Sequence, residues 1–190
     1  MPSAAFQEHL LVLLADSDEL NDAHFELRTG APGRQWGLGA INRAVVVMSV
    51  SAWEAYVEQV VIEAINAIRP VPPAALGAWP AVNASARSAI GRFNNPNVEN
   101  VRMLFSDSIG LANITTSWFW RNCTVEHARE LLAEALRLRH EIAHGVNPRP
   151  VIHNSYASWL PSFFRRLGSR TDFGIRDHLQ NTMGVVPWPA

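Results

Sequence analysis

Lysine is absent from this sequence, and cysteine is nearly so. All 16 basic residues are arginine, which excludes reactions that pass through a lysine Schiff base or a lysine nucleophile. The single cysteine, Cys123, excludes an internal disulfide and any cysteine-rich metal site. A chain with one cysteine suits a reducing compartment, so we expect a cytoplasmic location.

The sequence also has no long apolar run. Its longest apolar stretch, residues 44–53, is far shorter than the roughly 18 residues that a membrane span requires. The apolar run at residues 10–15 has no basic lead-in and is followed at once by acidic residues, so we expect no targeting segment and no membrane partner. A chain of 190 residues that is 48% apolar is expected to form a single domain, residues 1–190.

Neither sign of charge is in large excess, but the charge is unevenly distributed. The net charge of −1 predicts no broad nucleic-acid-binding surface. Residues 1–120 carry 7 arginines and 11 acidic residues, a charge of −4, whereas residues 121–190 carry 9 and 6, a charge of +3. The adjacent Arg165 and Arg166 could contact phosphate, but a solvated helix face is the preferred interpretation of such a pair.

Apolar periodicity predicts an all-α fold. We expect helices from about residue 4 into the twenties, over residues 41–68, within residues 84–93 and from about Asn95 onward, with residues 1–40 forming an N-terminal helix and loop and residues 69–97 a proline-rich connection. The clearest helix covers residues 124–144, with Thr124 as its N-cap and Gly145 after its end. One or two helical segments should follow between residues 153 and 183. The fold is therefore an up-and-down bundle of four to six helices.

One arginine interrupts the apolar face of the helix over residues 124–144. On a wheel with Val125 at 0°, eight apolar residues fall in an arc centred near 310°, and Arg139 lies within it at about 320°. An unpaired guanidinium there would cost several kcal/mol. Glu54, the only charge among residues 44–57, is the partner that the sequence offers. For such a pair, a buried ion pair that only sets helix register is slightly preferred to a functional role.

Two histidines lie at the end of the same helix, His140 at about 60° and His144 at about 100° on the wheel. Single histidines at helix ends are usually surface groups that the helix dipole stabilises. Here two histidines and an arginine on the apolar face converge within two turns. This convergence favours a functional site.

Residues 140–144, His-Glu-Ile-Ala-His, match a zinc-protease signature in which two histidines bind metal and the glutamate acts as base. No glutamate follows Glu141 to supply a third ligand, and Asn147 and Pro150 stand where the metzincin pattern needs glycine and histidine. Glu141 also falls on the solvated face, at about 160°.

The remaining candidates for a third ligand are Asp172, Asp177, His153 and His178. A zinc hydrolase is the third-ranked interpretation, and we expect no metal or other cofactor.

Starting from Arg139, the same segment is an arginine, four residues, His144 and Gly145. It resembles the motif of the HEPN superfamily, an arginine and a polar residue followed by a histidine four to six positions after the arginine. Two further segments are similar to the RiboL-PSP-type and related branches of that superfamily. Residues 51–57, Ser-Ala-Trp-Glu-Ala-Tyr-Val, resemble the second-helix signature, and residues 95–101 with Gly110 and Leu111 resemble the start of the third helix. The resemblance covers about residues 41–183.

The resemblance implies a helical bundle that commonly dimerises, with two motifs across a shared cleft, and often metal-independent cleavage of RNA. Arg139 and His144 take the motif positions, and His140 takes its polar position. In this chemistry His144 removes the ribose 2'-hydroxyl proton, Arg139 stabilises charge on the phosphate, and Glu54 supports Arg139. Because Arg139 and His144 are about 140° apart on one helix, the length of the arginine or a second subunit must close the gap.

The leading hypothesis is therefore a metal-independent endoribonuclease acting in phage defence, a toxin–antitoxin pair or a stress response. Its expected partners are RNA, a second copy of the chain and an antitoxin or regulatory protein. The main alternative is a HEPN-like module that binds RNA or a protein without cutting. We interpret the aromatic residues Trp118, Phe119 and Trp120 as core or dimer interface rather than as part of the site.

Overall fold

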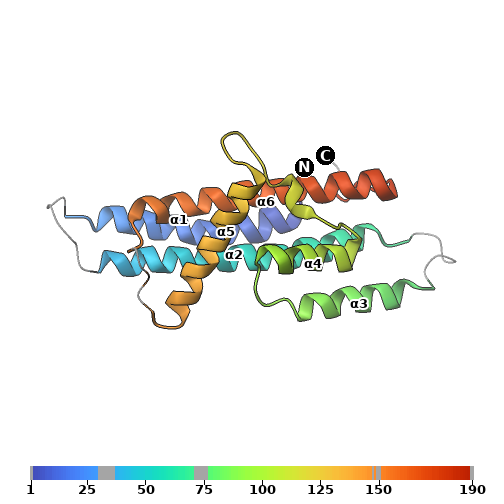
Figure 1. The fold of residues 1–190 in the computed structure, drawn as a ribbon, viewed down its shortest axis with the longest axis horizontal. Helices are drawn as coiled ribbons and strands as arrows, with labels where there is room; N and C mark the ends of the chain where they lie inside the picture. The colour runs from blue at the N-terminus through green and yellow to red at the C-terminus, as the bar shows by residue number, and fades with distance from the viewer. Residues whose placement is uncertain (1, 30–36, 71–76, 147, 149–150, 189–190) are drawn as a thin grey trace.

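The computed structural model describes residues 2–29, 37–70, 77–146, 148 and 151–188, and this part of the chain is all-α (Figure 1). α1, α2 and α6 lie side by side as long rods, α5 crosses them obliquely, and α3 and α4 pack at one end. The elements in chain order are a π-helical turn (Ala5–Leu10), α1 (Leu11–Glu26), α2 (Leu38–Ala67), α3 (Trp79–Gly91), α4 (Val98–Ile109), a 3-10 turn (Ile114–Ser117), α5 (Val125–Ala143) and α6 (Asn154–Met183). The predicted all-α bundle is confirmed.

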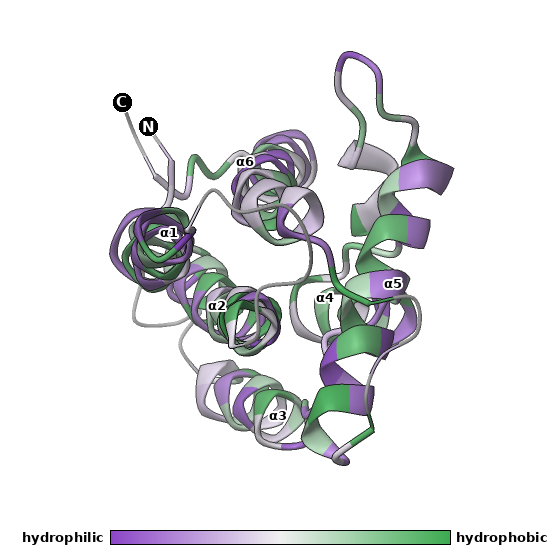
Figure 2. Ribbon diagram, turned by 90° about the vertical axis from the view of Figure 1, so that its left-hand side faces the viewer, coloured by the Kyte–Doolittle hydropathy of each residue, from purple (hydrophilic) through white to green (hydrophobic). Residues whose placement is uncertain are grey.

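The hydrophobic core forms around α2. Thirteen of its residues are buried, each of the other five helices contacts it, and in Figure 2 it lies between α1, α3 and α6. Its Trp53 is fully buried, with ring centroids 6.0 Å from Phe164 of α6 and 5.9 Å from Trp118. Because α2 is covered on most sides, its sequence is apolar all round instead of carrying one apolar stripe.

By length and composition alone, α2 is also the one described helix that could cross a membrane. Its most apolar window is 56% buried inside the bundle. A helix that packs against all the others of its own chain meets the same two criteria because it forms the core. The apolarity of α2 is thus explained by its packing.

A buried carboxylate joins the N-terminal segment to α2 and α6. Asp172 of α6 is 4% exposed and accepts hydrogen bonds from the backbone N–H of Ser3 at 2.6 Å, the Ser3 hydroxyl at 2.8 Å and the Tyr56 hydroxyl at 2.6 Å. Burial raises the pKa of Asp172, and the bonds from Tyr56 and Ser3 oppose that rise. The Glu63 carboxylate accepts two further backbone N–H groups of the same segment at 3.0 Å each. Specific polar bonds therefore hold the start of the chain against the core.

Three predicted helix ends are present as the capping residues indicated. The Asn97 side chain accepts the backbone N–H of Asn100 at 2.8 Å at the start of α4, and Thr124 accepts that of His127 at 3.2 Å at the start of α5. Gly145 follows α5 with a φ of 71°, a conformation that glycine adopts without the steric penalty of a Cβ atom.

One helix start differs from the prediction. α3 begins at Trp79, with Pro80 in its first turn, so the helix expected within residues 84–93 starts earlier and takes part of the proline-rich connection 69–97; residues 71–76 of that segment lie outside the described residues. Proline is compatible with a helix start because the first N–H groups have no partner in the helix. α6 is one helix of 30 residues that continues through Pro161. Its Gly168 is required by packing, because a Cβ atom there would lie 2.3 Å from the Leu10 side chain.

We predict that Tyr56→Phe lowers the free energy of unfolding. The Tyr56 hydroxyl lies 2.6 Å from Asp172 Oδ1 and 2.9 Å from the Gly168 carbonyl, and losing it leaves both buried acceptors with one donor fewer, at a cost of about 1–3 kcal/mol. Urea unfolding measures this loss. Tyr156→Phe is the matched control, because the Tyr156 hydroxyl is buried with no hydrogen-bond partner. Equal losses of unfolding free energy in the two variants would contradict a stabilising role for the hydrogen bonds between Tyr56 and Asp172.

Candidate functional site

The C-terminal half of α5 places the motif residues at the edge of the core. The buried residues of this helix are Ala128, Leu132, Ala135 and Leu138. Ala143, which was expected on the apolar face, is exposed. The buried face is therefore rotated toward Leu138, at about 220° on the wheel. At about 320° on the wheel Arg139 lies between the buried Ala128 and Leu132, so it is on the buried face as predicted. Its side chain is nevertheless 36% exposed, so the guanidinium both meets a carboxylate and reaches solvent.

The predicted partner of Arg139 is present across the α2–α5 interface. Arg139 Nη2 lies 3.6 Å from Glu54 Oε2, and the Glu54 side chain is 21% exposed. This distance gives an ion pair but is too long for a hydrogen bond. Burial raises the pKa of Glu54, and the Arg139 charge opposes the rise. Arg139 is thus oriented by Glu54 while its guanidinium stays open to solvent and to an anionic ligand.

A second carboxylate, Glu58, lies one turn further along α2. Burial raises the pKa of Glu58, and the neighbouring Glu54 charge raises it further. Glu54 therefore has an ion-pair partner on α5 and a second carboxylate beside it on its own helix. Sequence reasoning missed Glu58, although its i,i+4 spacing from Glu54 indicates that both lie on one side of the helix.

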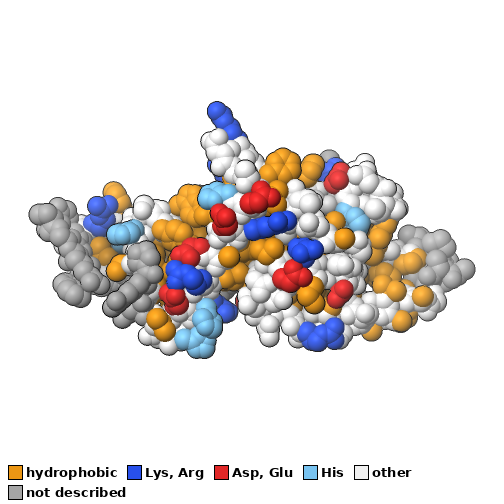
Figure 3. Space-filling view, in the orientation of Figure 1, with side chains coloured by type: hydrophobic (Ala, Val, Ile, Leu, Met, Phe, Trp, Pro, Cys, Tyr) orange, Lys and Arg blue, Asp and Glu red, His pale blue; other side chains and the backbone are white. Residues whose placement is uncertain are grey.

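His140 and His144 form the exposed part of the site. Their ring centroids are 4.3 Å apart with the rings inclined by 53°, and both side chains are exposed. Figure 3 shows histidine side chains gathered at the lower end of α5. Among the described residues no hydrogen bond joins Arg139 to either ring. One chain therefore brings the two histidines together, while Arg139 and His144 remain on different sides of α5.

A charged ladder runs beside the motif on α5. Arg137 donates to both carboxylate oxygens of Glu134, at 2.7 and 2.8 Å, and also bonds Glu141. The bonds from Arg137 hold the pKa of Glu134 below its ordinary value. The Glu141 side chain is only 25% exposed, and its Oε2 is buried without a hydrogen-bond partner. Glu141 lies on the solvated face of α5, as predicted, where it forms a ladder with Glu134 and Arg137 at i,i+3 and i,i+4 spacing.

The third ligand that a zinc site requires is not assembled around the histidine pair. Within the described residues no group of three or more His, Cys, Asp and Glu side chains is placed to hold a metal. Asp172 is bonded to Ser3 and Tyr56, the His178 ring lies 3.0 Å from the Ile109 carbonyl, and Asp177 accepts from Asn181. His153 precedes α6 as its N-cap residue. These placements disfavour the zinc hydrolase.

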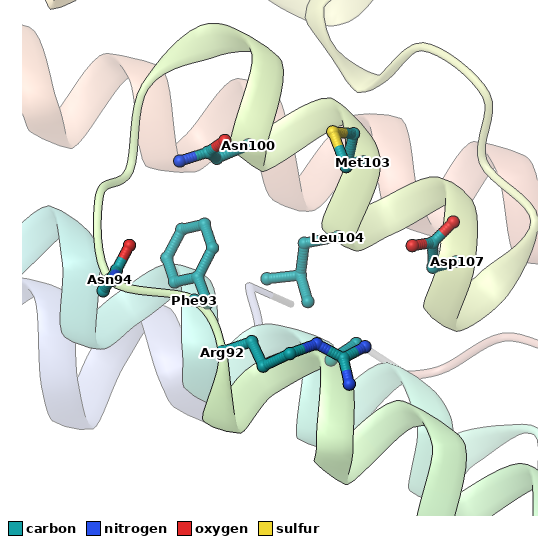
Figure 4. Close-up of a pocket in the computed structure, with 8 residues that line it drawn as sticks. Arg92, Phe93, Asn94, Asn100, Met103, Leu104 and Asp107 are labelled. Carbon is teal, nitrogen blue, oxygen red and sulfur yellow. The ribbon is translucent and has the colours of Figure 1, made fainter.

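A hollow of about 240 Å³ lies between α3 and α4, away from the motif residues (Figure 4). Two of its polar lining residues are engaged within the chain: Arg92 donates to Ser88 at 2.8 Å and Asn100 donates to the Asn95 carbonyl at 2.9 Å. No motif residue lines it, so this hollow is separate from the site on α5.

The RiboL-PSP-HEPN family model matches residues 13–172, which run from α1 through most of α6. The chain belongs to the RiboL-PSP-HEPN family. Glu54 on α2 and both Arg139 and His144 on α5 lie inside the matched region of this HEPN domain, so the resemblance seen in the sequence is confirmed at the level of the family. Comparisons with curated proteins and with solved structures find no match.

Glu54→Gln should change how stability depends on pH. The pKa of Glu54 is raised in the folded HEPN domain. Its contribution to stability is therefore complete below the pKa of the unfolded chain and is lost as the pH rises through the folded-state pKa. The stability of the native chain relative to Glu54→Gln should decline as the pH rises above 4.5, the ordinary value of this carboxyl. At neutral pH the two should differ by less than about 1 kcal/mol, because the ion pair is partly exposed.

Chemical unfolding of both proteins across this pH range provides the measurement. Arg139→Ala is the informative companion variant, because it removes the charge that lowers the pKa of Glu54. In this variant the decline in stability should therefore extend to higher pH. Parallel stability profiles for the native chain and Glu54→Gln would rule out a raised pKa at this carboxyl.

Proposed function

We propose that this HEPN domain is a metal-independent endoribonuclease. The observation that carries the proposal is the exposed His140–His144 pair, with ring centroids 4.3 Å apart, on the helix that also presents Arg139. Two adjacent imidazoles supply one proton acceptor and one proton donor near neutral pH. An arginine held by Glu54 supplies planar N–H donors for a phosphate.

In the proposed reaction the ribose 2'-oxygen attacks the adjacent phosphorus. His144 removes the 2'-hydroxyl proton as the new oxygen–phosphorus bond forms, and His140 gives a proton to the 5'-oxygen as its bond to phosphorus breaks. Arg139 stabilises the charge that develops on the phosphate oxygens. The products are a 2',3'-cyclic phosphate and a 5'-hydroxyl, and no external water or metal is consumed.

We further propose that the active form is a homodimer in the cytoplasm. Within one chain Arg139 and His144 lie on different sides of α5, about 140° apart on the wheel. A second copy that brings its own α5 alongside would supply the missing member of the arginine–histidine pair. Phage defence, a toxin–antitoxin system or a stress response are the roles we propose, with an antitoxin or regulatory protein restraining the nuclease.

A second candidate function is an RNA-binding or protein-binding HEPN module without catalysis. The observation that favours it is the ion pair between Arg139 and Glu54, which gives the arginine a structural role independent of any substrate. Under this alternative the domain binds its partner but leaves RNA intact.

Purified protein should cut mixed RNA in the presence of EDTA and leave cyclic phosphate ends. His144→Ala and Arg139→Ala should each lower the cleavage rate by about 10²–10⁴-fold, as expected for loss of a general base or of a phosphate-stabilising donor. His140→Ala should slow release of the 5'-oxygen to a similar extent. His127→Ala is the matched control, because His127 is an exposed histidine at the other end of the same helix.

Gel analysis of labelled RNA with end-group mapping distinguishes the hypotheses. Cleavage that EDTA abolishes would overturn the metal-independent reaction and would indicate that residues 140–144 bind a metal. Absence of cleavage under all conditions, with RNA or protein binding retained, would favour the non-catalytic module.

A further inference from the structure

One side of α6 carries a regular stripe of exposed residues. Positions separated by three or four residues lie on the same side of a helix, and along α6 the exposed side chains at this spacing are Ser155, Trp159, Ser162, Arg166, Ser169 and Phe173. We call this set the α6 stripe. It spans about 27 Å along the helix axis at 1.5 Å per residue.

The α6 stripe has an unusual charge environment. The sequence contains no aspartate or glutamate from residue 142 to residue 171, so the first four turns of α6 carry arginine as their only charged residue type. Arg165 bonds Asp18 of α1, whereas Arg166 is exposed on the stripe. The next acidic residues of α6 are the buried Asp172 and the exposed Asp177. The stripe therefore carries one positive charge, Arg166, and no negative charge.

An aromatic platform lies at the Phe173 end of the stripe. Phe119 is 51% exposed and Phe173 is 55% exposed, and the Arg170 guanidinium carbon lies 4.5 and 5.0 Å from the centres of their rings. Arg170 Nε donates to the Ser117 carbonyl at 2.9 Å, which fixes the guanidinium in place. Two exposed rings are thus held in position around one cation, and of the two places expected for Phe119, core or dimer interface, the structure rules out the core.

A second aromatic surface lies at the other end of the stripe. Trp159 is 38% exposed and stacks on Phe163, with ring centroids 5.3 Å apart and planes inclined by 26°. It also contacts Tyr156 at 5.9 Å, and Tyr156 is close enough to Glu134 and Arg137 of α5 for their charges to act on its hydroxyl. The stripe therefore leads toward the half of α5 that carries the motif.

The loop of residues 118–123 adds an arginine above the stripe. Trp120 lies 6.1 Å from Phe163 of α6, and a bridge between Trp120 and Cys123 leaves Arg121 in an exposed turn. The loop projects from the bundle in Figure 1, and in Figure 3 hydrophobic side chains gather on both sides of its base. Arg166 lies on the stripe between Trp159 and Phe173, and Arg121 lies in the exposed turn of the loop whose Trp120 packs against Phe163.

We propose that the α6 stripe and this loop bind single-stranded RNA, with bases stacked on Trp159 and on the Phe119–Phe173 platform and phosphates against Arg121 and Arg166. The inference rests on the proposed function in taking RNA as the substrate. Exposed rings interleaved with arginines suit unpaired bases and their phosphates. Serine is depleted in protein–protein interfaces, so a stripe with serine at every other position favours the nucleic acid.

The test is equilibrium binding of a labelled single-stranded oligoribonucleotide to full-length His144→Ala, in which cleavage is disabled, followed by fluorescence anisotropy. Trp159→Ala and Phe173→Ala, each added to this background, should weaken binding by about tenfold, as expected for removal of one stacking ring. Arg121→Ala with Arg166→Ala should also reduce the slope of log affinity against log salt by roughly 0.7 for each phosphate that is no longer neutralised.

Matched controls lie elsewhere on the surface. Phe25→Ala removes a ring that is 71% exposed on α1, and Arg87→Ala removes an exposed arginine of α3; both should bind RNA as the parent does. Unchanged RNA affinity in the stripe variants would overturn the proposal. If these variants also lost self-association while they kept their RNA affinity, the stripe would be identified as a dimer interface. Cleavage by the native chain is measured separately. If the stripe binds RNA but the native chain cuts none, the proposed nuclease function is overturned and the proposed RNA-binding surface is not.

Discussion

The burial of α2 is the constraint on which the rest of the structure depends. All five other helices contact it, so each is positioned by the side of α2 that it covers. The same helix carries the few polar groups that give the packing its register: Tyr56 meets Asp172 of α6, Glu63 receives the N-terminal backbone, and Glu54 meets Arg139 of α5. A buried or half-buried polar group must find its partner to offset desolvation. Apolar burial therefore supplies most of the driving force, and these polar contacts select one arrangement of the helices.

The packing of α5 against α2 determines which side chains of the motif are exposed. The helix is anchored by small and apolar side chains on one face, and the packing leaves the Arg139 side chain partly exposed and both histidines exposed. An arginine in this position is oriented by Glu54 and still reaches solvent, which suits a group that must meet a substrate phosphate. The start of α6 approaches α5 at Tyr156, where the charges of Glu134 and Arg137 act on the hydroxyl. In the RiboL-PSP-HEPN domain of this chain, the motif lies on α5 and the surface proposed to bind RNA lies mainly on α6.

Sequence patterns were most informative where local chemistry decides the outcome. The caps at Asn97 and Thr124 and the glycine at position 145 are each explained by backbone groups within a few residues; Thr124 and Gly145 lie where they were predicted, and α4 begins within three residues of the predicted start near Asn95. The patterns failed where a contact came from elsewhere in the chain. The proline signals placed the start of the helix near residue 84, whereas α3 begins at Trp79 and packs against α4 and α2. The helical wheel alone could not show how far the side chain of Arg139 is exposed.

By itself the sequence determined the helical class, the dominance of one apolar helix, the candidate pair of Glu54 and Arg139, and the motif that marks the family. These features depend on periodicity, composition and spacing, which are properties of a linear chain. Only the tertiary structure decided how far Arg139 is exposed, that Asp172 is a structural junction, and that Phe119 and Phe173 share one arginine. Each of these depends on the rotation of one helix against another, and that rotation is set by the packing of side chains far apart in the sequence.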